Sequence, residues 1–116
     1  MGKIVVLVLL IILGLVIYHD RQYDIFNAVY SGDVDWVKKV LDKYPKKANE
    51  LFYDSSIERS ILQEAVTRSD IEIIEELLKS GADINYQGYY LDTALHYATG
   101  KKDIVEFLLK NKAVSR

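Results

Sequence analysis

Apolar residues recur at helical spacing in three stretches of the chain. In residues 70–83 and 103–113, an aspartate is followed by an apolar pair, charged residues and a leucine pair. Residues 32–43 carry the same order of acidic start, apolar pair, charged pair and apolar pair. Because residues three and four positions apart share one face of a helix, the pattern predicts three similar amphipathic helices.

A shorter helical segment precedes each of these helices and is centred on an alanine. The alanines are Ala28, Ala65 and Ala98, separated by 37 and then 33 residues. A small side chain at this position allows paired helices to approach closely. A two-helix unit that recurs with this period predicts a helical solenoid of three repeats.

The repeated residues resemble the ankyrin repeat. Residues 93–98 differ at one position from the family's Thr-Pro-Leu-His-x-Ala signature, and residues 77–85 match the Leu-Leu to Gly-Ala-Asp-x-Asn end of the unit. The copy at residues 60–65 keeps the apolar and alanine positions, and residues 23–33 resemble an N-terminal cap. The resemblance implies an all-α ankyrin-repeat solenoid within residues 22–116. Its repeats are expected at about 23–52, 58–85 and 91–113.

Cap residues are expected at the ends of the second helices. Asp33, Asp70 and Asp103 stand where a side-chain oxygen accepts hydrogen bonds from the free amides at a helix start. Gly81 follows the helix that ends near Lys79, where a left-handed residue closes a helix.

The last repeat departs from the family pattern in two places. Leu91 replaces the glycine expected before the Thr-x-Leu-His block, and a glycine appears instead at Gly88, so the usual turn is not assumed for this finger. Five residues separate Ala98 from Ile104, whereas seven separate Ala65 from Ile73, so the last inter-helix turn is shorter.

The N-terminus carries a run of fifteen residues without a charge, Ile4–Tyr18, preceded by Lys3. Such a run fits the apolar region of a signal peptide, but no small-residue cleavage site follows it. With the residues before it, the run reaches the lower limit of about 17 residues for a membrane span. We therefore expect residues 1–21 to be an uncleaved signal anchor and short exit segment, with a single transmembrane helix at residues 4–18. A cleaved signal peptide is the alternative.

The charges around this run predict an orientation. The amino terminus and Lys3 are positive, whereas Asp20 and Arg21 cancel on the other side. The expected location is a single pass through the inner membrane, with the N-terminus cytoplasmic and the ankyrin domain periplasmic. After signal cleavage, the alternative location is the periplasm.

Composition and motifs argue against several functions. Seventeen acidic and 15 basic residues give a net charge of −2, which does not favour nucleic-acid binding. The chain has no cysteine and two histidines, and it contains neither a Gly-x-Ser-x-Gly motif nor a phosphate-binding loop. In the resembling family the histidine at His96 bonds to the threonine at Thr93, a structural role. We expect no catalytic residue, no cofactor and no metal, and hence no enzyme.

Nine tyrosines are the remaining signal. Tyrosine suits binding surfaces because it offers a large contact area at low entropic cost and keeps a polar tip. The alternative is that some of these rings pack over neighbouring fingers. The expected partner-binding residues lie in the fingers and the concave groove of the array: Tyr30, Tyr53, Arg68, Tyr86, Tyr89, Tyr90 and Tyr97.

Together these features predict a membrane-anchored module that faces the periplasm and binds one protein partner. Small exported ankyrin proteins resemble bacterial immunity proteins, which neutralise a secreted antibacterial toxin such as a type VI effector. The alternative is a scaffold or protective partner of a periplasmic enzyme such as catalase. Both roles are analogies to the fold and do not derive from a chemical site.

Overall fold

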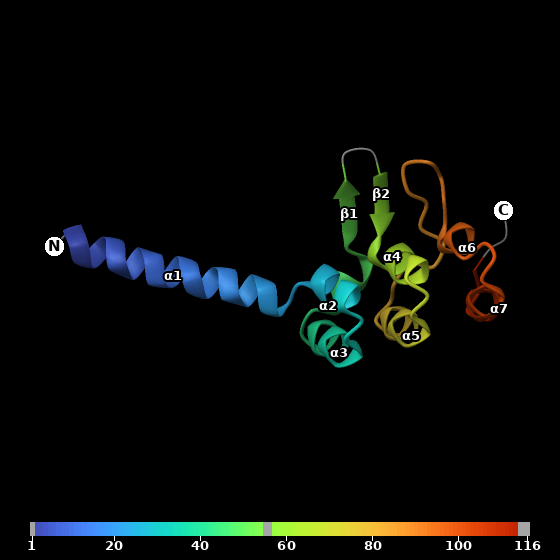
Figure 1. Cartoon of the computed structure of the whole chain (residues 1–116), viewed down its shortest axis with the longest axis horizontal. Coiled ribbons are helices and arrows are strands. Elements are labelled where there is room, and N and C mark those ends of the chain that lie inside the picture. Colours follow the sequence, from blue (N-terminus) through green and yellow to red (C-terminus); the bar gives the residue numbers. More distant parts are fainter. Residues whose placement is uncertain (1, 55–56, 114–116) are drawn as a thin grey trace.

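The helices that follow residue 24 stack in two layers beside two projecting fingers, and the N-terminal helix extends away from them (Figure 1). The computed structural model describes residues 2–54 and 57–113, without the side chains of residues 17–20 and 54. The elements are α1 Gly2–Gln22, α2 Ile25–Ser31, α3 Val34–Lys43, the 3-10 helix η1 Pro45–Asn49, β1 Leu51–Asp54, β2 Ile57–Ser60, α4 Ile61–Thr67, α5 Ile71–Lys79, α6 Ala94–Tyr97 and α7 Lys102–Lys110.

Three helix pairs form the array, as the repeated pattern predicted. Helices α2, α4 and α6 lie in one layer, and α3, α5 and α7 lie below them in the other (Figure 1). Ala28, Ala65 and Ala98 are fully buried. The apolar stripes of the second helices complete one continuous core, which includes Val37, Val40, Leu41, Ile73, Ile74, Leu77, Ile104 and Leu108. Each repeat therefore buries its apolar face against the next repeat.

The predicted caps are confirmed in the first two repeats. The Asp33 carboxylate accepts from the Trp36 amide at 3.0 Å, and the Asp70 carboxylate accepts from the Ile73 amide at 3.2 Å. Gly81 has a φ of +94°, the left-handed conformation expected after α5. These contacts satisfy backbone groups that a helix end leaves free.

The cap predicted at Asp103 is wrong. Helix α7 begins at Lys102, so Asp103 lies inside its first turn, and Lys101 is the capping residue without a side-chain cap bond. The shorter turn after α6 brings the chain into the helix two residues earlier than in the middle repeat. An aspartate in the first turn still favours the helix through its charge.

The predicted transmembrane helix is also wrong. Helix α1 starts at Gly2 and runs to Gln22, yet no helix in the described part of the chain is long and apolar enough to cross a membrane. The physical reason is length, since fifteen uncharged residues rising 1.5 Å each reach about 22 Å, less than the hydrocarbon core of about 30 Å. The expected single-pass placement in the inner membrane is therefore not supported.

The first finger adds a β-hairpin to an array that was expected to be all-α. Strand β1 pairs antiparallel with β2, and Phe52 lies opposite Arg59 while Tyr53 lies opposite Glu58. The hairpin stands beside the second finger, residues 85–92, which connects α5 to α6 (Figure 1). Both fingers rise from the α4 side of the helix layer, so their tips form a separate surface.

The close approach at Ala65 gives a test of the packing. Ala65→Leu should overpack the buried contact between the repeats and lower the free energy of unfolding by about 1–3 kcal/mol, as measured by urea denaturation. Thr67→Leu, which adds the same side chain at the exposed end of α4, should change stability by less than about 0.5 kcal/mol. Equal effects of the two substitutions would contradict the assigned contact.

Candidate partner-binding surface

The second finger is held by a buried side chain of the preceding repeat. Gln63 lies in the first turn of α4 and is 1% exposed. Its amide nitrogen donates to the Tyr86 carbonyl at 3.1 Å and to the Asp92 carbonyl at 2.7 Å, at the two ends of the finger. Its amide oxygen accepts from the Ser60 amide at 3.0 Å, which completes a capping box at the start of α4. One side chain thus ties a helix start to both ends of the finger.

Gly88 allows the second finger to lie close against the first. A Cβ atom at Gly88 would meet the Glu58 carbonyl oxygen at 2.4 Å, a distance that the backbone of strand β2 could not accommodate without moving. The Gly88 amide donates to the Asp92 carbonyl at 3.1 Å, and the Leu91 amide donates to the Gly88 carbonyl at 2.9 Å. These bonds close a tight turn whose middle residues are Tyr89 and Tyr90.

Leu91 occupies a backbone conformation that usually requires glycine. Its φ is +61°, at the position where the family pattern has a glycine. A left-handed conformation costs a residue with a Cβ atom about 1–2 kcal/mol. The rest of the finger, held by Gln63, must therefore maintain this strained residue.

Tyr86 anchors the second finger to the hairpin. Its hydroxyl donates to a Glu58 carboxylate oxygen at 2.9 Å. The pKa of Tyr86 is raised to about 12, first by burial and second by the hydrogen bond to the Glu58 carboxylate. The neutral phenol is favoured because ionising it would place a second negative charge beside Glu58.

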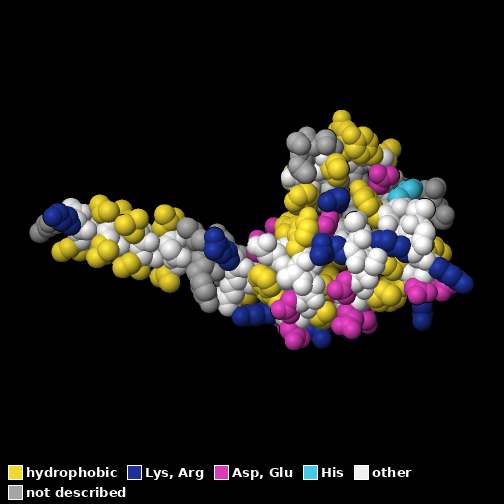
Figure 2. Space-filling view, in the orientation of Figure 1, with side chains coloured by type: hydrophobic (Ala, Val, Ile, Leu, Met, Phe, Trp, Pro, Cys, Tyr) yellow, Lys and Arg dark blue, Asp and Glu magenta, His cyan; other side chains and the backbone are white. Residues whose placement is uncertain are grey.

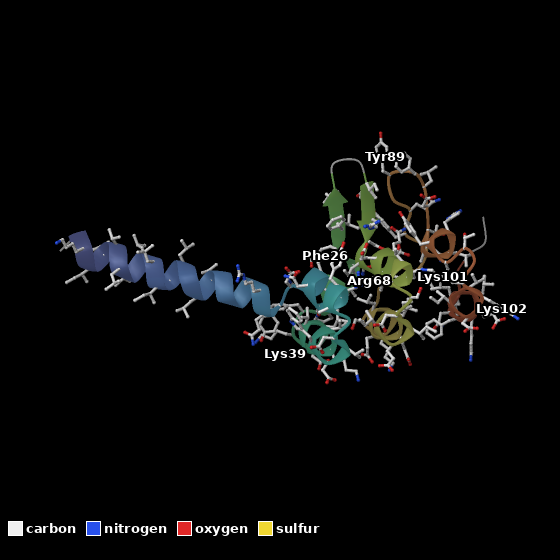
Figure 3. The ribbon with its side chains drawn as sticks, in the orientation of Figure 1. Phe26, Lys39, Arg68, Tyr89, Lys101 and Lys102 are labelled. Atoms are coloured by element: carbon white, nitrogen blue, oxygen red, sulfur yellow. The ribbon has the colours of Figure 1, made fainter. Side chains whose placement is uncertain are left out.

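The tip of the second finger exposes three consecutive large side chains. Tyr89, Tyr90 and Leu91 are 72%, 64% and 66% exposed. The two tyrosine rings contact edge to face, with centroids 5.0 Å apart. Figure 2 shows hydrophobic side chains gathered at the top of the fingers, and Figure 3 places Tyr89 at the outermost point. Tyr53 on β1 is also exposed.

A chain of contacts links the hairpin to the first helices α2 and α4, along the surface between the fingers and the first helices that we call the concave face. The ring of Phe26 on α2 lies 5.5 Å from the ring of Phe52 on β1, and the guanidinium of Arg59 lies 5.5 Å from the Phe52 centroid. The Arg59 Nε atom is 2.7 Å from a Glu64 carboxylate oxygen, in an ion pair that is not aligned as a hydrogen bond. Tyr97 lies at the end of α6. Burial raises the pKa of its phenol, and the negative charge of Asp92 adds to the rise.

Arg68 and Lys101 connect adjacent repeats at the ends of the first helices. The Arg68 guanidinium donates to the Tyr30 carbonyl at 2.7 Å and lies 4.9 Å from the Tyr30 ring centroid. The Lys101 ammonium donates to the Val66 carbonyl at 3.0 Å and to the Thr67 carbonyl at 2.8 Å. Each cation lies at the C-terminus of the first helix in the preceding repeat and covers carbonyl groups there. Figure 3 labels both side chains.

The predicted binding residues therefore occupy three environments. Tyr53, Tyr89 and Tyr90 are displayed at the fingers, whereas Tyr86 and Tyr97 are half-buried. Tyr30 and Arg68 are exposed but contact one another across two repeats.

Five residues that join the fingers to the first helices were not predicted from the sequence: Phe26, Phe52, Arg59, Gln63 and Glu64. One signal was present, because Glu64 precedes Ala65 as Tyr97 precedes Ala98, and Tyr97 was assigned to the groove. The position of Gln63 in its repeat likewise equals that of His96.

The structural role expected of His96 is confirmed. Its Nδ1 atom accepts from the Thr93 amide at 2.9 Å and lies 2.9 Å from the Thr93 hydroxyl. Among the described residues, no group of three or more histidine, aspartate or glutamate side chains is placed to hold a metal ion. The fingers and the adjoining face offer aromatic rings, backbone groups and charged side chains that another molecule can contact.

Comparisons with known proteins agree with this architecture. A family model described as ankyrin repeats (3 copies) matches residues 25–115. Ankyrin repeat and SAM domain-containing protein 6 of Rattus norvegicus is 32% identical over 96 residues, 80% of this chain and 10% of that protein. Serine/threonine-protein kinase 12 of Arabidopsis thaliana is 54% identical over 46 residues, 38% of this chain and 10% of that kinase.

The chain belongs to the ankyrin-repeat family, since the match covers more than half of its length. It spans about a tenth of the length of the curated relatives it matches. Ankyrin repeats are typically protein–protein interaction modules.

The Tyr86–Glu58 contact predicts a dependence of stability on alkaline pH. The folded pKa of about 12 lies above the ordinary value of 10.0, so the folded state keeps a proton that the unfolded state releases. This contribution is complete below about pH 10 and is lost as the pH rises through about 12. Tyr86→Phe should cost about 1 kcal/mol at pH 7.

Urea denaturation from pH 7 to 12 checks this expectation. The stability difference between the wild type and Tyr86→Phe should shrink above about pH 10. Tyr89→Phe, which removes an exposed hydroxyl, should follow the wild type throughout. A constant difference between the wild type and Tyr86→Phe up to pH 12 would show that the Tyr86 phenol does not act in this way.

The strain at Leu91 predicts a stabilising substitution. Leu91→Gly should raise the free energy of unfolding by about 1 kcal/mol, because glycine adopts a positive φ without a steric penalty. Leu91→Ala removes the exposed side chain but keeps the Cβ atom, so it should give no gain. Thermal and urea denaturation measure both. A gain of equal size in the alanine variant would place the cost in the exposed side chain and not in the backbone.

Proposed function

We propose that this chain binds one protein partner through the tips of its fingers and the adjoining concave face. The observation that supports this proposal is the run Tyr89, Tyr90 and Leu91, three large side chains exposed in succession on a turn that the repeat holds in place. Large rings displayed on a fixed backbone lose little entropy on binding. The proposed binding unit is the ankyrin domain, residues 22–116.

The backbone strain at Leu91 also favours a binding role for this finger. Glycine would adopt the same turn without strain, yet an exposed leucine stands there. An exposed leucine adds little to stability, so folding does not explain it. A contact with a partner does explain it, because strained residues cluster at sites where the chain has a function.

The concave face is more polar than the tip of the second finger. Beside the apolar tip lie the half-buried ring of Tyr97 and the partly exposed side chain of Arg59, which is paired with the buried Glu64. A binding surface with an aromatic anchor and a polar surround matches the usual anatomy of a protein interface. The immunity and catalase-protecting roles depended on a periplasmic location, which is no longer supported, so we limit the proposal to protein binding.

The experiment that tests this proposal compares two double variants with equal numbers of changes. The Tyr89→Ala/Tyr90→Ala variant should lose a bound partner, because a buried aromatic anchor contributes about 2 kcal/mol, or about 30-fold in affinity, per side chain. The Glu72→Gln/Glu75→Gln variant alters exposed carboxylates on the outer helix α5 and should bind within about threefold of the wild type.

Proteins captured on the immobilised chain are identified by mass spectrometry, and their affinities for the purified variants are then measured. Both variants should keep the thermal stability of the wild type, because the changed side chains are solvent-exposed. A partner that binds the tyrosine variant normally and fails with the glutamate variant would move the interface to the outer helices and overturn the proposal.

A further inference from the structure

Strand β1 forms an open edge of the hairpin. The sheet has two strands, and β2 has β1 on one side and the second finger on the other. In the described part of the chain, no helix or strand lies beyond β1 on its outer side (Figure 1). An open edge offers a row of backbone donors and acceptors that another chain can use.

The register shows which backbone groups face outward. The Ile61 amide donates to the Glu50 carbonyl at 2.9 Å, so this pair, just before the hairpin, is a hydrogen-bonded pair. Such pairs alternate along an antiparallel ladder. Phe52 and Asp54 therefore bond to β2, whereas the amides and carbonyls of Leu51 and Tyr53 point away from it.

Contacts of the second strand support this alternation. Ser60, opposite Leu51, turns its amide away from β1 to the Gln63 side-chain oxygen at 3.0 Å. Glu58, opposite Tyr53, has its carbonyl against Gly88 of the second finger. On the β1 side, no described residue outside the hairpin hydrogen-bonds to the backbone of Leu51 or Tyr53.

We propose that the outer edge of β1 binds an extended segment of a protein partner as a third strand, through the backbone of Leu51 and Tyr53. Backbone hydrogen bonds supply affinity in this mode, and neighbouring side chains supply selectivity. The rings of Phe26 and Phe52 lie beside the edge and favour apolar side chains at alternate positions of the segment. Glu50, which directly precedes β1 and is partly exposed, favours a lysine or arginine at that end of the segment.

A second copy of this chain fits the edge poorly. A four-residue strand paired with the same strand of another copy buries far less than the area of about 1,200 Å² that a stable interface needs.

The test uses a phage-displayed library of random decapeptides selected on the immobilised full-length chain. Selected peptides should alternate apolar residues and carry a lysine or arginine near one end. Tyr53→Pro removes the outward amide without removing a bond of the β1–β2 ladder, and proline is accepted on an edge strand. It should weaken a synthetic selected peptide about tenfold, as expected for one lost hydrogen bond.

Tyr53→Thr is the matched control, because it removes the ring but keeps the amide in a β-favouring residue. It should bind the peptide within about threefold of the wild type. An equal loss of peptide affinity in Tyr53→Pro and Tyr53→Thr would show that the peptide binds the Tyr53 ring and not its amide, which overturns the proposal. Normal binding to Tyr53→Pro, or a selection that yields no peptide, would also overturn it. The Tyr89→Ala/Tyr90→Ala variant should bind the peptide as the wild type does, so that failure of the edge proposal can be distinguished from failure of the proposed binding role of the finger tip.

Hydrogen exchange gives a second readout that does not depend on the folding of the proline variant. In the wild-type chain, the Tyr53 amide should gain protection when the peptide binds, whereas the Phe52 amide should already be protected by β2. No gain at Tyr53 overturns the proposal. Sedimentation of the chain alone should give a monomer mass, and concentration-dependent dimers lost in Tyr53→Pro would assign the edge to a second copy instead.

Discussion

The buried amide of Gln63 is the contact on which the arrangement of the fingers depends. It caps the start of α4 through Ser60 and holds the Tyr86 and Asp92 carbonyls at both ends of the second finger. A buried side chain with all these partners is rigid, and removing one partner leaves a polar group unsatisfied at a cost of about 1–3 kcal/mol. The close approach at Gly88 and the position of the exposed tip both follow from this bond network.

The tyrosines of the second finger have two different roles, one structural and one at the exposed surface. Tyr86 uses its hydroxyl to join the two fingers, whereas the rings of Tyr89 and Tyr90 are exposed at the tip. Composition cannot separate these roles, because the residue type is the same in each. The separation comes from the neighbours that the fold supplies, a carboxylate for the first and solvent for the others.

The helix pairs could be predicted from sequence because their signals are local. The apolar stripes, the small residues at Ala28, Ala65 and Ala98, and the caps at Asp33 and Asp70 lie within one repeat. The missed features depend on distances between repeats or on turn length. Asp103 misses the cap position because its turn is short, and Arg59 meets Glu64 only once the hairpin lies against α4.

The candidate surface was predictable in part, for a related reason. Tyrosines in the fingers indicated a displayed surface, but the backbone strain at Leu91 and the open edge of β1 are properties of conformation. The predicted membrane span failed on length, since hydropathy indicates where a helix is apolar but not whether its apolar run reaches across a bilayer.

Arg68 and Lys101 stand at the same position of consecutive repeats, three residues after Ala65 and Ala98. The second and third repeats thus each supply the cation that covers the helix end of the repeat before them. Each of these contacts is lost when either of its two repeats opens. Opening an end repeat therefore weakens the middle repeat from either side, because the middle repeat shares one cation contact with each neighbour.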